Sequence, residues 1–512
     1  MQNAGAAWLM TTLVASPALV SLMQTATSLP TFLFGLPAGA LADIVDRRRL
    51  MLATQAWMLA SALALAVLTV LGEVGPWTLL ALTFSIGAGV ALSGPAWQAT
   101  SPHLVPPAEL PSAVALNGVA VNLGRAAGPA AGGLLLSAAG ASAVFFANAA
   151  SFVGMLGVVF RWTPPTRRWT LPPERVASAV LAGVRYLRHS PPLRAVLVRT
   201  VLFVGGASAL FALLPVVASR ELDVGSAGFG LLLGVLGLGA IAGAALLPRL
   251  RRLLSLDALV VSGTLVVGGA LLVLALLHDL AAAFVALLAA GLSWIALLSS
   301  LNVVAQTSTP AWVRARALAA YLLVFQGGQA IGSIVWGGVA ELASLRSALL
   351  ASVVFLLLGA AAARRWRLRP GLEPEVTPFS WPEPSVHDEA GPSLDEGPIL
   401  VTVEYRIARG DVEEFLRLVR EVGRVRRRDG AYRWGIYRDL ADPERYLETF
   451  LLESWVEHLR QHHRGTVADR RLTERLRELH RGEEPPAVSH LAGEAWLGGV
   501  VDVGRLRGSA RG

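Results

Sequence analysis

The feature that most constrains this chain is a series of long apolar segments that fills its first 365 residues. Between residues 50 and 160, the only charged side chains are Glu73, Glu109 and Arg125. A bilayer core about 30 Å thick is spanned by a helix of about 20 apolar residues, and most of these segments have that length. The pattern predicts twelve membrane-spanning helices, near residues 1–14, 17–41, 50–71, 76–99, 113–137, 140–160, 195–218, 225–247, 256–277, 280–304, 315–340 and 343–363.

The first segment is shorter than the others. A helix from Met1 to Ser16 rises roughly 24 Å, which is less than the thickness of the hydrocarbon core. Residues 1–14 lack the positively charged start of a secretory signal, so we interpret them as part of a first membrane helix that is truncated. We expect the natural start of that helix to lie upstream.

Composition excludes several kinds of site. The chain is 54% hydrophobic and 16% charged, whereas ordinary soluble domains are about 25% charged. It contains no Cys, which excludes disulfides, thiolate metal sites and cysteine nucleophiles. The net charge of +8 comes from arginines at predicted helix ends and in one mixed-charge domain, so we expect no nucleic-acid partner. The sequence contains no motif for a cofactor.

The placement of arginine predicts the orientation in the membrane, because cytoplasmic loops carry an excess of positive residues. Alternate connections hold nearly all of the arginines: Arg47, Arg48, Arg49, several between Arg161 and Arg199, Arg249, Arg251, Arg252, Arg314 and Arg316, followed by Arg364 to Arg369 after the last helix. The opposite connections hold only Arg220 and Arg346. We therefore expect a multi-pass protein of the cell inner membrane, in contact with the lipid bilayer, with a cytoplasmic C-terminus.

Two six-helix halves resemble each other. The segment from Gln98 to Pro102 recurs from Gln306 to Pro310, each at the arginine-rich end of the fourth helix of its half. Two such halves place a small-molecule site between them near the middle of the membrane. The expected domains are residues 1–160 and 194–365 for the halves, 161–193 for a cytoplasmic linker with an amphipathic helix, 366–398 for a disordered linker, 399–497 for a soluble domain and 498–512 for a tail.

Residues 399–497 have the pattern of a small α+β domain. Alternating apolar residues predict strands near 399–407, 432–439, 445–453 and 487–496, and amphipathic helices are predicted near 411–428, 455–464 and 467–481. This βαββαβ order, with the second helix split, is that of a ferredoxin-like module. An exposed sheet edge favours pairing with a second copy, so we expect dimerisation through this module.

Two histidines of this module have a spacing that metal sites use. His458 and His462 lie four residues apart on a predicted helix, with His463 adjacent. We interpret them instead as a solvated cationic face, and we predict no metal site.

The connection between the second and third helices carries a motif. Gly39 begins a small-residue turn that leads to Asp43, and Asp46, Arg47 and Arg48 follow. Glycine permits close helix packing, the carboxylate of Asp43 can cap a helix or pair with an arginine, and the arginines hold the loop in the cytoplasm. The alternative is a loop that only sets the topology.

A second motif lies on the fifth predicted helix, where Gly128 and Pro129 are followed by Gly132 and Gly133. Small residues four apart let two helix backbones approach, and proline removes a hydrogen bond and bends the helix. Close packing without a specific function is the alternative interpretation.

The first motif resembles the signature loop of the major facilitator superfamily, although Asp46 stands where that family usually has Gly. The second resembles the GPxxGG element of the superfamily's exporters. Segments from Pro95 to Gln98 and from Gln326 to Gly332 are similar to the enterobactin-exporter-like branch, also called transmembrane secretion effectors. The C-terminal module more weakly resembles antibiotic-biosynthesis-monooxygenase modules. These resemblances imply proton-coupled export of siderophores, antibiotics or similar small amphiphiles by alternating access.

Polar side chains in the middle of the predicted helices are candidates for the wall of the cavity. They are Arg125, Asn122, Gln24, Gln326 and Gln329. An arginine at a helix centre costs about 2.5–3.5 kcal/mol, so Arg125 must face the bundle interior or water. It either contacts cargo or a coupling ion, or serves as a strut bonded to amides and carbonyls. The predicted helix centres contain no Asp or Glu, so the sequence does not support proton coupling by a midmembrane carboxylate.

Two other functions are compatible with the sequence. An importer on the same scaffold would have the same features, and only the direction of transport distinguishes it. An enzyme anchored by the membrane helices is the second alternative, but twelve helices in two related halves are more than an anchor needs. We therefore expect a transporter and not an enzyme.

Overall fold

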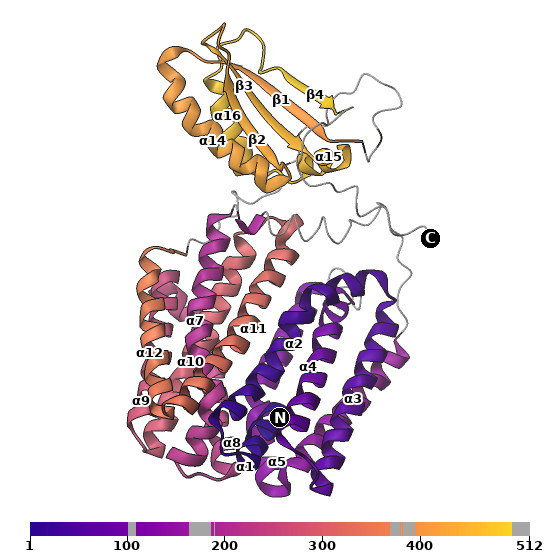
Figure 1. Ribbon diagram of the computed structural model, residues 1–512, viewed down its shortest axis with the longest axis vertical. Coiled ribbons are helices and arrows are strands. Elements are labelled where there is room, and N and C mark those ends of the chain that lie inside the picture. The colour runs from indigo at the N-terminus through magenta and orange to yellow at the C-terminus, as the bar shows by residue number, and fades with distance from the viewer. Residues whose placement is uncertain are drawn as a thin grey trace. The chain divides into compact units, whose positions relative to one another are not determined.

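The structure is a computed structural model that describes residues 1–100, 109–162, 186–188, 190–368, 379, 381, 393 and 396–493. It divides into two compact units (Figure 1). The first unit contains the membrane helices of both halves. The second contains the C-terminal module together with the segments around Tyr186 and Val313, which the sequence had not assigned to it.

Helices occupy all twelve predicted positions in the described part of the first unit. Those of the first half are α1 (Gln2–Leu13), α2 (Pro17–Ile44), α3 (Arg47–Leu71), α4 (Pro76–Thr100) and α5 (Leu110–Arg161). Those of the second half are α7 (Pro191–Val216), α8 (Ser226–Leu253), α9 (Leu256–Leu276), α10 (Leu280–Thr307), α11 (Ala311–Leu342) and α12 (Leu345–Ala361). α5 contains two predicted spans, because Gly140 interrupts it with a φ of 77°, which favours glycine. The predicted twelve-helix architecture is confirmed.

The helix ends follow from local capping. Asp46 is the N-cap of α3, and its side chain accepts a hydrogen bond from the Arg49 N–H at 2.8 Å. Gly72 ends the same helix in the left-handed conformation, with a φ of 74°. The aspartate that departs from the usual pattern of the loop motif therefore starts a helix here.

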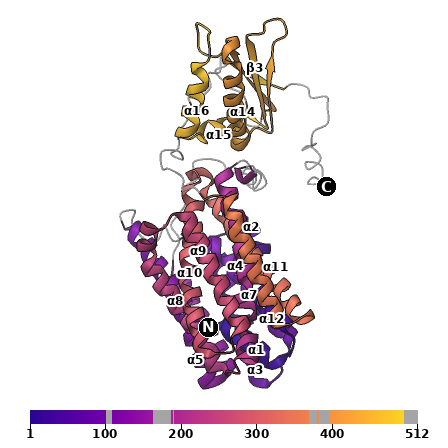
Figure 2. The same ribbon diagram turned by 90° about the vertical axis from the view of Figure 1, so that its left-hand side faces the viewer.

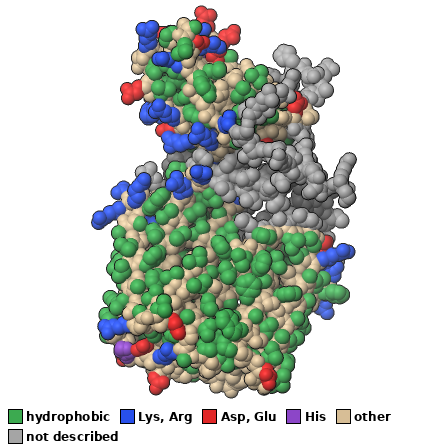
Figure 3. All heavy atoms as spheres, viewed as in Figure 1, with side chains coloured by type: hydrophobic (Ala, Val, Ile, Leu, Met, Phe, Trp, Pro, Cys, Tyr) green, Lys and Arg blue, Asp and Glu red, His purple; other side chains and the backbone are tan. Residues whose placement is uncertain are grey.

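The outer surface of the helical unit is apolar. Trp57, Val70 and Phe160 are all more than half exposed, and hydrophobic side chains cover the lateral face shown in Figure 3. Charged side chains gather at the ends of the helices in the same view. Nine helices among the described residues are long and apolar enough to cross a membrane. This distribution is the one that a bilayer requires, because its core cannot solvate charges.

The two halves meet where α5 packs along α8. A Cβ atom on Gly133 of α5 would collide with the backbone of Gly230 on α8, and one on Gly230 would collide with Gly133. Neither position therefore accepts a side chain at this spacing. The second motif of the sequence thus forms a backbone contact between the halves. α8 is held in turn to α10, where Gly239 meets the backbone of Leu288.

The C-terminal module has a four-stranded antiparallel sheet in the order β2-β3-β1-β4. Its elements are β1 (Ile399–Arg406), α14 (Val412–Asp429), β2 (Arg433–Arg438), β3 (Arg445–Leu452), α15 (Trp455–His463), α16 (Val467–Glu478) and β4 (Val488–Ala492). Helices cover one face of the sheet (Figure 2). The core between them includes Tyr405, Phe415, Leu418 and Phe450. The predicted order of strands and helices is confirmed.

The linkers differ in part from expectation. Residues 366–398 were expected to lack fixed structure, yet the backbones of Phe379 and Trp381 are hydrogen-bonded to the C-terminal module. Of the amphipathic helix expected within 161–193, near residues 174–189, residues 186–188 are helical and the rest lies outside the described residues. The tail at 498–512 also lies outside them.

We predict that Gly230→Leu separates α5 from α8, because the added side chain has no space against the backbone of Gly133. Overpacking of this kind costs about 1–3 kcal/mol or more. A lower melting temperature of the purified protein in detergent checks it. Gly154→Leu is the matched control, because a Cβ atom at Gly154 meets nothing within 4 Å. Equal melting temperatures for the two variants would contradict the contact.

Candidate functional site

The two halves are joined at one end by polar contacts. We call the end of the helices that carries Arg47 the arginine-rich end, and the other the opposite end. At the opposite end, Glu341 of α11 accepts hydrogen bonds from the Ser16 hydroxyl at 2.8 Å and from the Ala18 N–H at 3.4 Å. A carboxylate at the N-terminus of α2 is also favoured by the helix dipole. We name Ser16, Ala18 and Glu341 the latch.

Two further hydrogen bonds join the halves. The Thr25 hydroxyl of α2 donates to the Ala330 carbonyl of α11 at 3.1 Å. The Arg220 guanidinium, in the short helical segment Val217–Glu221 that follows α7, donates to the Ala15 carbonyl. Arg220 and Ala15 lie at the same end as the latch, and Thr25 and Ala330 lie further inside α2 and α11, so the halves are closed against each other at the opposite end.

A small cavity lies between the halves beside Gln24. Its lining comes from α1, α2 and α7: Asn3, Ala7, Val20, Met23, Gln24, Thr27, Phe211 and Pro215. The space left has a volume of about 20 Å³, which is room for about one water. The Gln24 amide nitrogen donates to the Ser28 hydroxyl at 3.3 Å, so this side chain is held at the cavity wall.

The two glutamines of α11, Gln326 and Gln329, differ in burial. Gln329 is buried, and its side-chain oxygen has no hydrogen-bond partner among the described residues. Gln326 is half-buried. A buried acceptor without a partner is costly, so Gln329 is available to a donor that enters the bundle.

The loop motif is described in part. Gly39 is half-buried and has open space where a Cβ atom would be. The Arg48 guanidinium donates to the carbonyls of Val159, at 3.3 Å, and Phe160 at the end of α5, where the helix dipole favours a cation. Arg47 is half-buried. Arg48, in the first turn of α3, thus ties the start of that helix to the C-terminal end of α5.

Several predicted residues are not described. The side chains of Asp43, Asn122, Arg125 and Pro129 lie outside the described part, although all four are on helices. Of their neighbours, Gly128 is half-buried, and Gly132 and Gly133 are buried at helix contacts. The predicted cavity residues are therefore not seen as one constellation in the described structure.

A partly buried ion pair at the arginine-rich end was not predicted from the sequence. Arg199 had been counted with the linker, but it lies inside α7 and is only 3% exposed. Its guanidinium is 3.5 Å from the Asp257 carboxylate at the start of α9, which also accepts from the Leu368 N–H at 3.0 Å. Asp257 thus joins α7 and α9 to the segment that leaves α12.

One of the three histidines of the predicted solvated face is buried, whereas His462 is half-buried and His463 is exposed. His458 is 1% exposed and packs against the rings of His462 and His490, with centroids 4.7 and 4.8 Å away. Burial, together with the neighbouring imidazoles, lowers the pKa of His458 to about 3. The interpretation as a charged face is wrong for His458, because β4 covers it. The described residues contain no group of three metal-ligand side chains with suitable geometry.

Two aspartates and an arginine form a buried network in the same module. The Arg428 guanidinium lies 2.7 Å from the Asp429 carboxylate and 2.6 Å from that of Asp469. It also lies over the ring of Tyr186, 5.8 Å from the centroid. Through this contact the module holds a residue that precedes α7 by a few positions in the sequence.

Comparisons with known proteins agree on one family. The sequence profile of the family described as transmembrane secretion effector matches residues 1–495. A multidrug efflux pump of Mycolicibacterium fortuitum, Tap, is 26% identical over 366 residues, covering 68% of this chain and 87% of its own. The enterobactin exporter EntS of Escherichia coli O1:K1 is 29% identical over 374 residues, covering 70% and 86%.

Solved structures share the fold. An inward-facing, unoccupied bacterial homologue of the human lysosomal transporter Spinster has a TM-score of 0.56 at 17% identity, over 72% of this chain and 93% of its own. The nucleoside transporter NupG has a TM-score of 0.60 at 11% identity, over 72% and 95%. At these identities the likeness concerns the fold alone.

We predict that Glu341→Ala weakens closure at the opposite end, because the Ser16 hydroxyl and the Ala18 N–H lose their acceptor. A loss of about 0.3–1 kcal/mol corresponds to a change of roughly two- to five-fold in the open population. The readout is the maleimide reaction rate of a cysteine at Ser21, which is buried. Glu73→Ala, exposed at the same end, is the control. Equal maleimide reaction rates in the Glu341→Ala and Glu73→Ala variants would contradict a role of the latch in closure.

We predict that His458 makes the C-terminal module less stable as the pH falls from about 6.5 toward 3, an effect that buried Asp429, whose pKa is raised to about 6, opposes below that pH. The pKa of His458 is about 3 in the folded chain, below its ordinary value of about 6.5, so protons favour the unfolded state in this window. The slope is at most about 1.4 kcal/mol per pH unit. His458→Phe should flatten it, as measured by calorimetric unfolding of the full chain between pH 7 and 5. An unchanged slope would assign the loss to other groups.

Proposed function

Because the chain belongs to the transmembrane secretion effector family of the major facilitator superfamily, we propose that it exports a siderophore, an antibiotic or a similar small amphiphile. The observation that carries the proposal is the family match over residues 1–495, on a chain whose helical halves meet through α5 and α8. The direction is supported by relatives named as an efflux pump and an enterobactin exporter. The protein is a multi-pass inner-membrane transporter of small molecules.

Transport by alternating access fits the contacts between the halves. The latch closes the opposite end. Gly133 and Gly230 touch through backbone atoms, so no long side chain has to repack when the two halves rotate against each other. Cargo would bind between the halves, with Gln24, Gln329 and Arg125 as its contacts. The halves would then exchange closure at one end for closure at the other.

Protons are the coupling ion that we propose. Asp43 is the carboxylate of the loop motif at the arginine-rich end, and the predicted helix centres contain no Asp or Glu. In this proposal Asp43 pairs with an arginine of the motif, and a proton on Asp43 would weaken that pairing and so favour opening at that end. Gly39, Arg47 and Arg48 belong to the same gating loop.

For the C-terminal module we propose a cytoplasmic location and a role that is not enzymatic. The excess of arginine on its side of the membrane helices supports the location. The strand order β2-β3-β1-β4 supports the ferredoxin-like assignment. β2 and β4 are the edge strands of the sheet, which supports pairing with a second copy.

Vesicles of known sidedness test the proposed function. With enterobactin as the probe, inside-out vesicles should accumulate it only when an imposed proton gradient is present. Asp43→Asn should abolish this uptake while the protein stays inserted and abundant. Accumulation confined to right-side-out vesicles would identify an importer on the same scaffold and overturn export.

We predict that Arg125→Gln weakens the binding of anionic cargo more than Arg125→Lys does. Arginine stays charged and offers five donors, whereas lysine keeps the charge without the planar fork. Both variants should retain the wild-type melting temperature, and equilibrium binding of a radiolabelled probe measures their affinity. Wild-type affinity with a lower melting temperature in the glutamine variant would make Arg125 a strut.

A further inference from the structure

Two aromatic residues of the linker after α12 are bound to the C-terminal module. We call Phe379 and Trp381 the strap. The Phe379 N–H donates to the Gly465 carbonyl at 2.9 Å, and the Trp381 N–H donates to the His462 carbonyl at 3.0 Å. Their rings meet edge to face with centroids 5.2 Å apart, and the Arg470 guanidinium lies 5.0 Å from the centre of the Phe379 ring. The strap is therefore seated in a defined position.

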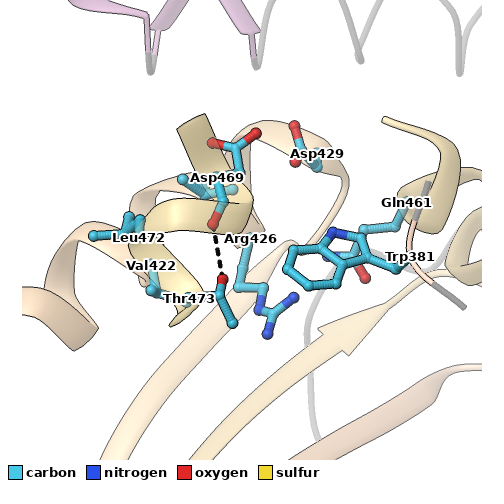
Figure 4. Close-up of a pocket in the computed structure, with 9 residues that line it drawn as sticks. Trp381, Val422, Arg426, Asp429, Gln461, Asp469, Leu472 and Thr473 are labelled. Carbon is cyan, nitrogen blue, oxygen red and sulfur yellow. Dashed lines mark hydrogen bonds between the residues drawn. The ribbon is translucent and has the colours of Figure 1, made fainter. Parts of the chain in front are cut away.

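The half-buried Trp381 indole lines a small pocket together with residues of α14, α15 and α16. The other residues of the lining are Val422, Val425, Arg426, Asp429, Gln461, Asp469, Leu472 and Thr473. Arg426 and Gln461 lie to either side of the indole in Figure 4. The space left has a volume of about 10 Å³, which is no more than the space that one water molecule occupies. Without the indole, the pocket would hold a single aromatic ring between apolar and polar walls.

One group of the pocket is left unsatisfied by this occupant. Gln461 is 5% exposed; its side chain interacts with the His458 imidazole, and its amide nitrogen has no other hydrogen-bond partner among the described residues. The indole nitrogen of Trp381 is itself a donor and has no lone pair to offer. A buried donor without an acceptor costs about 1–3 kcal/mol, so an occupant that carries an acceptor would bind this pocket better than tryptophan.

The charges around the pocket select a neutral occupant. Asp429 and Asp469 are both paired with Arg428, at 2.7 and 2.6 Å. The Arg426 guanidinium is 3.5 Å from the buried Glu448 carboxylate. Each charge of the pocket already has a counter-ion. A charged ligand would therefore lose hydration free energy on binding without forming a new ion pair.

We propose that this pocket is a binding site for a small, planar, neutral aromatic molecule with an acceptor oxygen, and that the ligand displaces Trp381. The ring of the ligand takes the place of the indole, and its oxygen accepts from the Gln461 amide. The strap is part of the covalent connection between α12 and the module, so displacement alters that connection. The site is separate from the cargo path and goes beyond the proposed export function.

Cysteine labelling of the full chain tests the proposal, because the natural chain contains no Cys. Ser380→Cys places a thiol between the two strap residues in the sequence, and its maleimide reaction rate reports whether the strap is seated. Benzamide, which carries a ring and a carbonyl, should raise the rate several-fold, whereas toluene at equal concentration should not. No increase with benzamide, or an equal increase with toluene, would overturn the proposal.

Two further variants identify the groups involved. In Ser380→Cys with Gln461→Leu, the rate without ligand should equal that of Ser380→Cys alone, and benzamide should lose its advantage over toluene. Trp381→Ala should bind benzamide at least ten-fold more tightly than the wild type by titration calorimetry, because the competing indole is gone. Equal affinities would contradict the competition. These measurements are made in detergent and do not involve transport. A negative result in them therefore does not contradict export, and a negative transport assay does not contradict ligand binding at this pocket.

Discussion

In a bilayer, helices gain little by burying apolar side chains, because lipid tails are as apolar as leucine. Two helices from different halves therefore stay together through close backbone contact, and α5 and α8 achieve it where Gly133 faces Gly230. α8 makes the same kind of close backbone contact with α10. A Cβ atom added at Gly239 or Gly243 would collide with the backbone of Leu288 or Leu292, respectively. The arrangement of the halves depends on these small residues.

A contact built from backbone leaves the ends of the helices free to make and break polar contacts. At the opposite end, Glu341 joins α11 to the start of α2. At the arginine-rich end, Arg48 bonds to α5 of its own half, and Asp257 bonds to α7 and to the exit from α12, also within one half. Among the described residues, the polar contacts named at the arginine-rich end thus hold each half together, whereas the latch holds the halves to each other.

The helix positions could be predicted because bilayer thickness sets the length of an apolar segment. The break at Gly140 was also visible, since the apolar run is too long for one span. The pairing of Arg199 with Asp257 was not predictable, because the partners are 58 residues apart and their meeting depends on how α7 packs near α9.

The C-terminal module shows the same limit. The alternation of apolar and polar residues predicted its strands. It did not reveal that β4 places His490 against His458, so that a surface predicted to be charged is in part a buried cluster of rings. The composition of the linker indicated disorder, and nothing local marked Trp381 as a residue that lines a pocket of the module. Both features depend on contacts between distant segments. The depth of Arg125 in its helix was predicted from the sequence, and its contacts remain a prediction.

The central claim is that the halves rock about the contact of α5 with α8. Distances between paired spin labels test it most directly, because the chain has no Cys and labels attach only where cysteines are introduced. One pair replaces the exposed residues Leu13 and Leu342 at the opposite end, and the other replaces Val45 and Leu253 at the arginine-rich end. During proton-driven transport, the account predicts that one distance lengthens as the other shortens. Two distances that stay fixed while transport proceeds, or that change in the same direction, would contradict it.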